Sequence, residues 1–170
     1  MLGIGGKELS EENAAQTAKA TNIIQPDFIR VHATGIKLES KLGEFVRDGS
    51  FTLQSEEEIV IEQKLFLQQL HEMDSYYVNE HIVNLLLEVR GNLRTEKQEM
   101  LSTIDRFLTL PPDERLLFTV GRRLNIFFRL DDLKKPKLHQ KAGESLQQIL
   151  SKNPHVDFAA LCNYVRQSQI

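Results

Sequence analysis

The stretch SEEEIVIEQKLFL, residues 55–67, decides the fold class of this chain. Ser55 and Glu58 form a capping-box pattern. In it, the Ser55 hydroxyl accepts a hydrogen bond from the Glu58 backbone N–H, and the Glu58 carboxylate accepts one from the backbone N–H of Ser55. Three glutamates fill the first turn, where the positive end of the helix dipole stabilises negative charge. The following residues are apolar on more than one side, so we expect a central helix from about Glu56 to Met73.

Helix-start signals of the same kind recur on both sides of this stretch. Thr95 followed by Gln98 is a second capping-box pattern, and Pro112 and Pro154 suit the first turn of a helix, which does not need every backbone N–H. Apolar residues recur between these signals at helical spacing, and no strand-like segment is expected after Ser55. The expected helices span about residues 10–24, 28–47, 56–73, 75–89, 96–108, 113–130, 136–151 and 154–167.

This pattern predicts an all-α protein, as a compact multi-helix bundle or a short stacked helical array of six to eight helices. Residues 10–170 are expected to form a single helical domain. Residues 1–9 hold three glycines and few apolar side chains, so they are expected to form a flexible N-terminal tail. Alternate helix starts lie about 40 residues apart, the length of a two-helix repeat, but no matching residues recur at equivalent positions. A repeat array therefore stays an alternative to an irregular bundle.

The composition is typical of a folded, water-soluble domain. Of the 170 residues, 41% are hydrophobic and 26% are charged. The single cysteine, Cys162, has no partner for an intramolecular disulfide. No run approaches about 18 apolar residues, and residues 1–13 lack the apolar core of a signal peptide. We therefore expect no membrane span and a cytoplasmic location, although a chain exported by a specialised secretion system would have the same pattern.

Charge is divided unevenly along the chain. Residues 1–94 carry 9 Lys or Arg and 15 Asp or Glu, whereas residues 95–170 carry 12 and 9. The second part is too weakly positive to indicate a nucleic-acid-binding domain. Its charge does favour association with an acidic partner.

The sequence contains no recognisable catalytic, metal-binding or cofactor-binding motif. The histidines fall in neither a Glu-x-x-His nor a His-Glu-x-x-His pattern. Cys162 lies on the apolar stripe of the last expected helix, where cysteine usually acts as a small core residue. The glycines of residues 3–6 lack the Lys-Ser/Thr ending of a P-loop. We therefore predict a protein that is not an enzyme, with no catalytic residue, no metal ligand and no cofactor.

An enzyme stays an alternative, because active sites assemble from residues distant in sequence. Its site would gather polar groups near one expected helix junction, residues 71–81. The candidate residues there are His71, Glu72, Asp74, Tyr77 and His81.

The densest positive charge, in residues 122–141, is the candidate binding site. The expected partner-contacting residues are Arg122, Arg123, Phe128, Arg129, Lys134, Lys135, Lys137 and Lys141. Cations near the end of a helix are also expected on electrostatic grounds alone, so a solvated connector is the competing interpretation. The functional hypothesis is a non-catalytic adaptor, regulatory subunit or chaperone-like binder that docks an acidic protein. The alternatives are a nucleic-acid-binding regulator that uses the same segment, and a homodimer.

Overall fold

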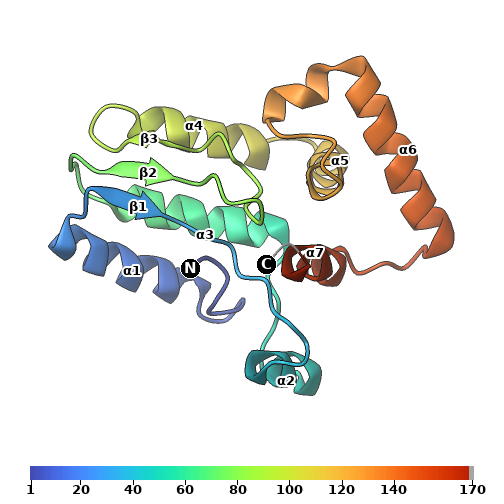
Figure 1. Ribbon diagram of the computed structural model, residues 1–170, viewed down its shortest axis with the longest axis horizontal. Coiled ribbons are helices and arrows are strands. Elements are labelled where there is room, and N and C mark those ends of the chain that lie inside the picture. Colours follow the sequence, from blue (N-terminus) through green and yellow to red (C-terminus); the bar gives the residue numbers. More distant parts are fainter. Residues whose placement is uncertain (169–170) are drawn as a thin grey trace.

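Seven α-helices, a short 3-10 helix and a small three-stranded sheet make up the part of the chain that the computed structural model describes, residues 1–168 (Figure 1). The expected mainly helical, compact fold is confirmed. The helices are α1 (Ser10–Ile24), α2 (Lys41–Asp48), α3 (Glu56–Gln69), α4 (Lys97–Leu108), α5 (Pro112–Arg123), the 3-10 helix η1 (Leu130–Lys134), α6 (Pro136–Lys152) and α7 (Phe158–Gln167). The strands are β1 (Phe28–Arg30), β2 (Tyr76–Val78) and β3 (Gly91–Asn92).

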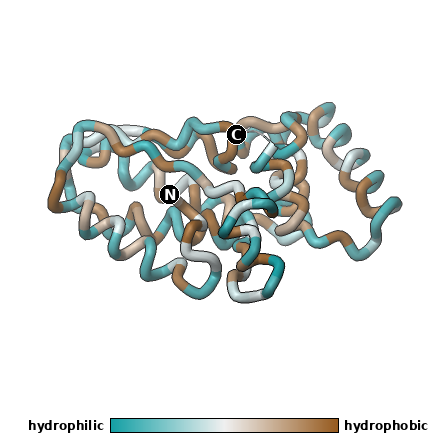
Figure 2. Tube along the Cα trace, turned by 60° about the horizontal axis from the view of Figure 1, so that its bottom comes forward, coloured by the Kyte–Doolittle hydropathy of each residue, from teal (hydrophilic) through white to brown (hydrophobic). Residues whose placement is uncertain are grey.

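The sheet and the helices form two layers over much of the molecule. The strand order is β1-β2-β3, with β1 parallel to β2 and β2 antiparallel to β3. The strands lie in front of α3 in Figure 1, and the turned view of Figure 2 places the strand layer above α1. The helices of residues 1–168 therefore cover one face of the sheet and leave the other uncovered by any described helix, while α6 projects at the far end of the molecule beside α5 (Figure 1).

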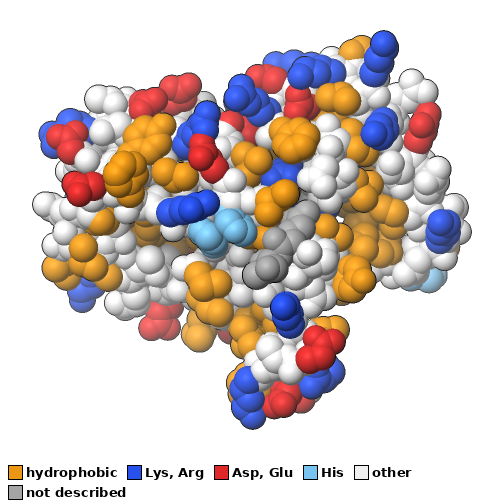
Figure 3. All heavy atoms as spheres, viewed as in Figure 1, with side chains coloured by type: hydrophobic (Ala, Val, Ile, Leu, Met, Phe, Trp, Pro, Cys, Tyr) orange, Lys and Arg blue, Asp and Glu red, His pale blue; other side chains and the backbone are white. Residues whose placement is uncertain are grey.

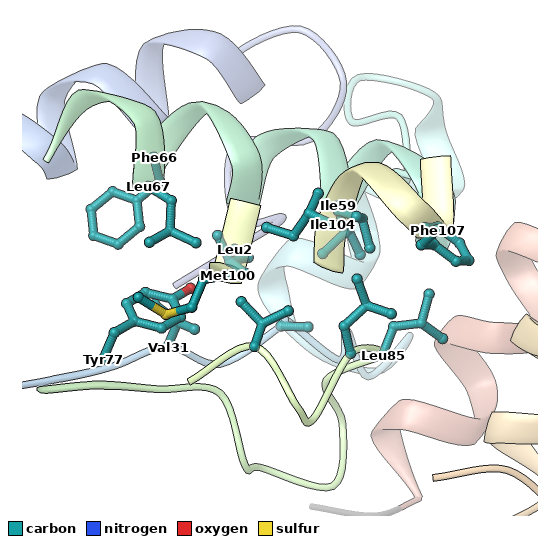
Figure 4. Close-up of a cluster of buried hydrophobic side chains, with 14 of the residues drawn as sticks. Leu2, Val31, Ile59, Phe66, Leu67, Tyr77, Leu85, Met100, Ile104 and Phe107 are labelled. Carbon is teal, nitrogen blue, oxygen red and sulfur yellow. The ribbon is translucent and has the colours of Figure 1, made fainter. Parts of the chain in front are cut away.

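Helix α3 forms the centre of the core, as its sequence predicts. Both hydrogen bonds of the Ser55–Glu58 capping box are present. Ile59, Phe66 and Leu67 are buried, and they pack with side chains from α4 and the sheet (Figure 4). Buried residues on more than one side of α3 give it its central position, although Ile61 remains 40% exposed.

A buried ion cluster ties α3 to two later helices. The Glu56 carboxylate accepts hydrogen bonds from Arg123 of α5, at 3.0 and 2.6 Å, and from Arg166 of α7, at 2.8 Å. All three side chains are buried. Burial alone would raise the pKa of Glu56, but Arg123 and Arg166 outweigh it and hold the pKa below its ordinary value.

The expected helix over residues 28–47 is wrong for most of its length. Residues 28–30 form β1, and a helix is present only in α2. Exposed and buried residues alternate from Phe28 to Val31, which is the period of a strand rather than of a helix. The apolar residues spaced at helical intervals in this stretch therefore misled the prediction.

The expected helix over residues 75–89 is also wrong, as is the expectation of no strand after Ser55. Tyr76, Tyr77 and Val78 form β2, in keeping with the strand preference of aromatic and β-branched residues. Two buried asparagines replace the helical hydrogen bonds in the irregular segment that follows. Asn84 accepts from the Ala33 N–H at 2.7 Å and donates to the Val31 carbonyl at 2.8 Å, while Asn79 donates to the Leu86 carbonyl at 2.6 Å.

Residues 1–9, expected to be a flexible tail, are instead built into the fold. Leu2 is buried and forms a parallel bridge with Ala33. The Gly3 N–H donates to the carboxylate of Glu62 at 3.0 Å, and Glu62 also accepts from Ser10 of α1 at 2.8 Å. These contacts fasten the start of the chain to α3.

Several expected helix boundaries also shift. Thr95 is not a cap, because α4 begins at Lys97 without a side-chain cap. Helix α5 begins at Pro112 as expected but ends at Arg123, short of residue 130, and Asn125 adopts a positive φ of 57° in the turn that follows. Pro154 lies in a turn, and α7 begins later, after the N-cap Asp157.

No helix within residues 1–168 is long and apolar enough to cross a membrane.

Candidate partner-binding face

The uncovered side of the sheet carries large aromatic side chains. Phe28 is 71% exposed and Tyr76 is 40% exposed, with ring centroids 6.4 Å apart, while Ile29 and Tyr77 point the other way into the core. Parallel strands in compact proteins usually have both faces covered. We call this side of the sheet, together with the adjoining exposed Ile82 and Phe128, the open face; hydrophobic side chains gather on it in Figure 3.

A hollow runs from the open face toward α4. One part, of about 510 Å³, is lined by Tyr76 at the sheet and by Phe128 and Arg129 after α5. A second part, of about 210 Å³, continues between α4 and η1. Both parts share the same four charged residues: Glu88, Arg90, Glu96 and Arg129.

Glu88 is a partly buried carboxyl in this hollow. One carboxylate oxygen accepts from the Leu130 N–H at 2.8 Å, and the other is buried without a hydrogen-bond partner among the described residues. Burial raises the pKa of Glu88, and the nearby Arg129 and Arg106 only partly oppose this effect. Perturbed carboxyls in hollows are typical of binding and catalytic sites, but structural carboxyls can be perturbed in the same way.

Two histidines stack beside the strands. The rings of His32 and His81 are 4.1 Å apart and inclined by 27°. Burial, the neighbouring His81 and the positive charge of Arg30 each lower the pKa of His32 below 6.5. His32 is therefore mainly neutral at pH 7, and the stack adds polar edges to a mostly apolar face.

The structure divides the eight residues of the expected binding site into four pairs. Arg122 and Arg123 are buried rather than exposed, so neither offers its charge to a partner. Arg122 donates to the carbonyl oxygens of Ile82 and Asn84, at 3.0 and 3.3 Å, and burial followed by Arg123 lowers its pKa to about 10. Its guanidinium lies 5.7 Å from the centre of the Phe128 ring, and this cation–π contact helps to hold Phe128 on the open face.

The other six residues are exposed. Phe128, 49% exposed, and Arg129 line the hollow. Lys134 pairs with Asp131 at 2.8 Å and Lys135 pairs with Asp132 at 2.7 Å, which reduces the positive field of this segment. The last pair, Lys137 and Lys141, lies on α6.

The five polar residues of residues 71–81 have separate surroundings. The Tyr77 hydroxyl accepts from Gln63 at 3.0 Å inside the core, and burial raises its pKa. Asp74 pairs with Arg94 at 3.3 Å at the surface, and His81 stacks on His32. His71 is exposed after α3, where its backbone N–H donates to Asn22, and the exposed Glu72 follows it. No group of three or more His, Cys, Asp or Glu side chains suited to a metal ion occurs in residues 1–168.

Cys162 is a core residue, as the sequence predicts. It is buried, and burial and the nearby Glu56 raise the pKa of its thiol to about 12. A thiol with such a pKa is almost entirely protonated at neutral pH and is a poor nucleophile.

Sequence reasoning missed Phe28 and Glu88, whereas the Tyr76-Tyr77 pair already indicated Tyr76 as a possible interface anchor. Phe28 was missed because residues 28–47 were expected to form a helix, and the strand signal of β1 is only three residues long. Glu88 had no local signal, because its burial depends on η1, more than forty residues later in the chain.

No protein-family model, curated protein or solved structure matches this chain.

Proposed function

We propose that this protein is a non-catalytic polypeptide-binding module that docks a partner protein on the open face. The observation that carries the proposal is the exposure of Phe28 and Tyr76 on an uncovered pair of parallel strands. Exposed aromatic side chains are typical anchors of protein interfaces, because they bury a large area with little loss of conformational freedom.

The charges around these aromatics favour an acidic partner. Arg30 on β1 and Arg129 in the hollow are exposed and form no ion pair with another described residue. In contrast, Arg90 pairs with Glu80, and Arg106 pairs with Asp131. A partner with an apolar centre flanked by carboxylates would therefore satisfy both free guanidinium groups.

Nucleic acid is a weaker candidate for the occupant. Two of the arginines in residues 122–141 are buried, and two of the lysines are paired with aspartates. The remaining cations give too small a positive surface for strong phosphate binding.

Site-specific photocrosslinking tests the proposal. A benzophenone side chain replaces Tyr76 on the open face, and a second version carries it at Lys141 on α6. We expect a protein that crosslinks from position 76 and not from position 141. Its affinity is then measured with purified components for Arg30→Glu with Arg129→Glu, and for the control Lys137→Glu with Lys141→Glu, which changes the net charge equally.

The expected result is a loss of affinity of about 10-fold or more in the open-face variant and little change in the α6 variant. Equal affinities in the two variants would remove the open face as the docking site. A complex that is lost on nuclease treatment would point to nucleic acid instead.

A further inference from the structure

The outer edge of β1 has unpaired backbone groups. On its inner edge, the Asp27 carbonyl accepts from the Tyr76 N–H at 2.8 Å and the Val31 N–H donates to the Val78 carbonyl at 3.1 Å. Because alternate residues of a strand direct their backbone groups to opposite neighbours, those of Phe28 and Arg30 point away from β2. None of these N–H and C=O groups has a partner within residues 1–168.

The same edge is already paired a few residues further along. The Leu2 N–H donates to the His32 carbonyl at 2.8 Å, and the Leu2 carbonyl accepts from the Thr34 N–H at 2.8 Å. This bridge is parallel to the direction of β1. It is a one-residue strand, so it covers the end of the edge and leaves Phe28 and Arg30 open.

Leu2, helix α1 and β1 together resemble a β–α–β unit, in which a helix connects two parallel strands. It connects Leu2 to β1 and packs against α3 on the covered side of the sheet (Figure 1). Its C-terminal residues Ile23 and Ile24 are 76% and 71% exposed, close in the chain to the exposed Phe28. A parallel unit normally buries such a helix end under a neighbouring strand.

We infer that the edge formed by Phe28 and Arg30 accepts an extended strand of the partner polypeptide, running parallel to β1. One partner residue donates its N–H to the Phe28 carbonyl and accepts from the Arg30 N–H, which repeats the pattern of Leu2 four residues earlier along the edge. The inference rests on the proposed function, which supplies the partner. It adds the conformation, direction and register of the partner segment that docks. Addition of a strand to a sheet edge is a common mode of peptide recognition.

The composition of the docked strand follows from its surroundings. One side of it lies over the exposed isoleucines of α1, which favours β-branched or other apolar residues. The other side continues the open face beside Phe28 and Arg30, where an aromatic residue and a carboxylate fit. An uncovered edge with apolar neighbours is otherwise an aggregation hazard, and Arg30 is the one charged residue among the three of β1 that protects it.

The chain itself offers a test that needs no partner. Since Leu2 runs parallel to β1, residues fused in front of Met1 enter the space beside Val31, then Arg30, then Phe28. The probe is an alternating Val-Thr extension of about seven residues, enough for one strand. Amide hydrogen exchange of Phe28 and Arg30 is compared with the unextended chain, with the Ile29 amide as internal reference because it already bonds to β2.

We expect the Phe28 and Arg30 amides to exchange at least about 10-fold more slowly in the extended chain, while that of Ile29 changes little. A control extension of equal length has proline at the positions that would donate N–H groups to the carbonyl oxygens of Phe28 and Arg30. It loses half of the hydrogen bonds of the added strand, so we expect clearly weaker protection of the Phe28 and Arg30 amides. If the Val-Thr chain aggregates, a Lys-Thr extension gives the same readout in soluble form.

Unchanged exchange at Phe28 and Arg30 in the Val-Thr or Lys-Thr chain overturns the inference. That result would not affect the proposed docking on the open face, which the affinities of the Arg30 and Arg129 variants test separately. A third outcome is protection of the edge amides while the open-face variants bind the partner normally. That outcome would support the strand site and contradict the proposed docking on the open face.

Discussion

Arg166 lies 2.8 Å from Glu56, so the last helix of the chain is joined by a buried ion pair to the first turn of α3. The same carboxylate holds Arg123 of α5. Glu56 begins α3 as one of three acidic residues that favour a helix start, and in the folded protein it also neutralises part of a buried cationic cluster.

Replacement of Glu56 by Gln is expected to destabilise the fold by about 3–5 kcal/mol, because it leaves Arg123 and Arg166 buried without a counter-charge. The measurement is the free energy of unfolding in urea. Glu57→Gln is the matched control: it removes a neighbouring carboxylate whose ion pair with Arg115 is partly exposed, and we expect a change below about 1 kcal/mol. Equal losses in the two variants would contradict a special role for the buried pair.

The stability from Glu56 also depends on pH. Its pKa in the folded state lies below the unfolded value, so its contribution is complete above the unfolded pKa and is lost as pH falls through the folded pKa. We expect the difference in unfolding free energy between the wild type and Glu56→Gln to shrink steadily below about pH 4.5. Urea titrations at several acidic pH values check this, and a constant difference would count against it.

Asn84→Ala is expected to disrupt the irregular segment after β2. The Ala33 N–H and the Val31 carbonyl lose their partners in the interior, and each buried polar group left unpaired costs about 1–3 kcal/mol. Asn153→Ala, at an exposed position after α6, is the control and is expected to change stability little. The readout is thermal unfolding, and similar midpoints for the two variants would contradict the role assigned to Asn84.

Relative to the wild type, Glu88→Gln is expected to have a more favourable free energy of unfolding at pH 7 than at pH 4. The folded-state pKa of Glu88 lies above 4.5, so folding favours its protonated form, and stability is lost as pH rises from 4.5 through the folded pKa. Glutamine keeps the acceptor for Leu130 and cannot ionise. Unfolding at both pH values measures the effect, and the exposed Glu99→Gln serves as the control. A variant that is equally destabilised at both pH values would contradict the prediction.

Replacing each of two glycines by alanine is expected to change the stability of the fold in opposite directions. A Cβ at Gly121 of α5 would lie 2.4 Å from a ring carbon of Phe127 and 3.2 Å from Ala142 of α6, so Gly121→Ala is expected to cost about 1–3 kcal/mol. A Cβ at Gly143 of α6 would meet no atom within 4 Å, so Gly143→Ala is expected to stabilise by about 0.5–1 kcal/mol through helix propensity. Chemical unfolding distinguishes them, and changes of the same sign would refute the described packing of α5 on α6.

Helices with local start signals were predictable, and the site mostly was not. The capping box at Ser55 and the proline at residue 112 act within one turn, so their effect can be read from neighbouring residues. Arg122 and Arg123, by contrast, resemble an exposed basic pair in the sequence. Their burial depends on Glu56 and on the carbonyl groups of residues 82–84, which lie far away in the chain.

The sequence by itself determined the mainly helical class, the central position of α3 and the helices α1, α4 and α6, because apolar residues recur in them at helical spacing. Only in α3 does a local capping box add to this pattern. Only the tertiary structure decided that residues 28–30 and 76–78 are strands. Their short extended segments become stable when they pair with each other and when Asn84 satisfies the backbone beside them. Pairing across nearly fifty residues leaves little trace in either segment alone, and the open face exists only because of it.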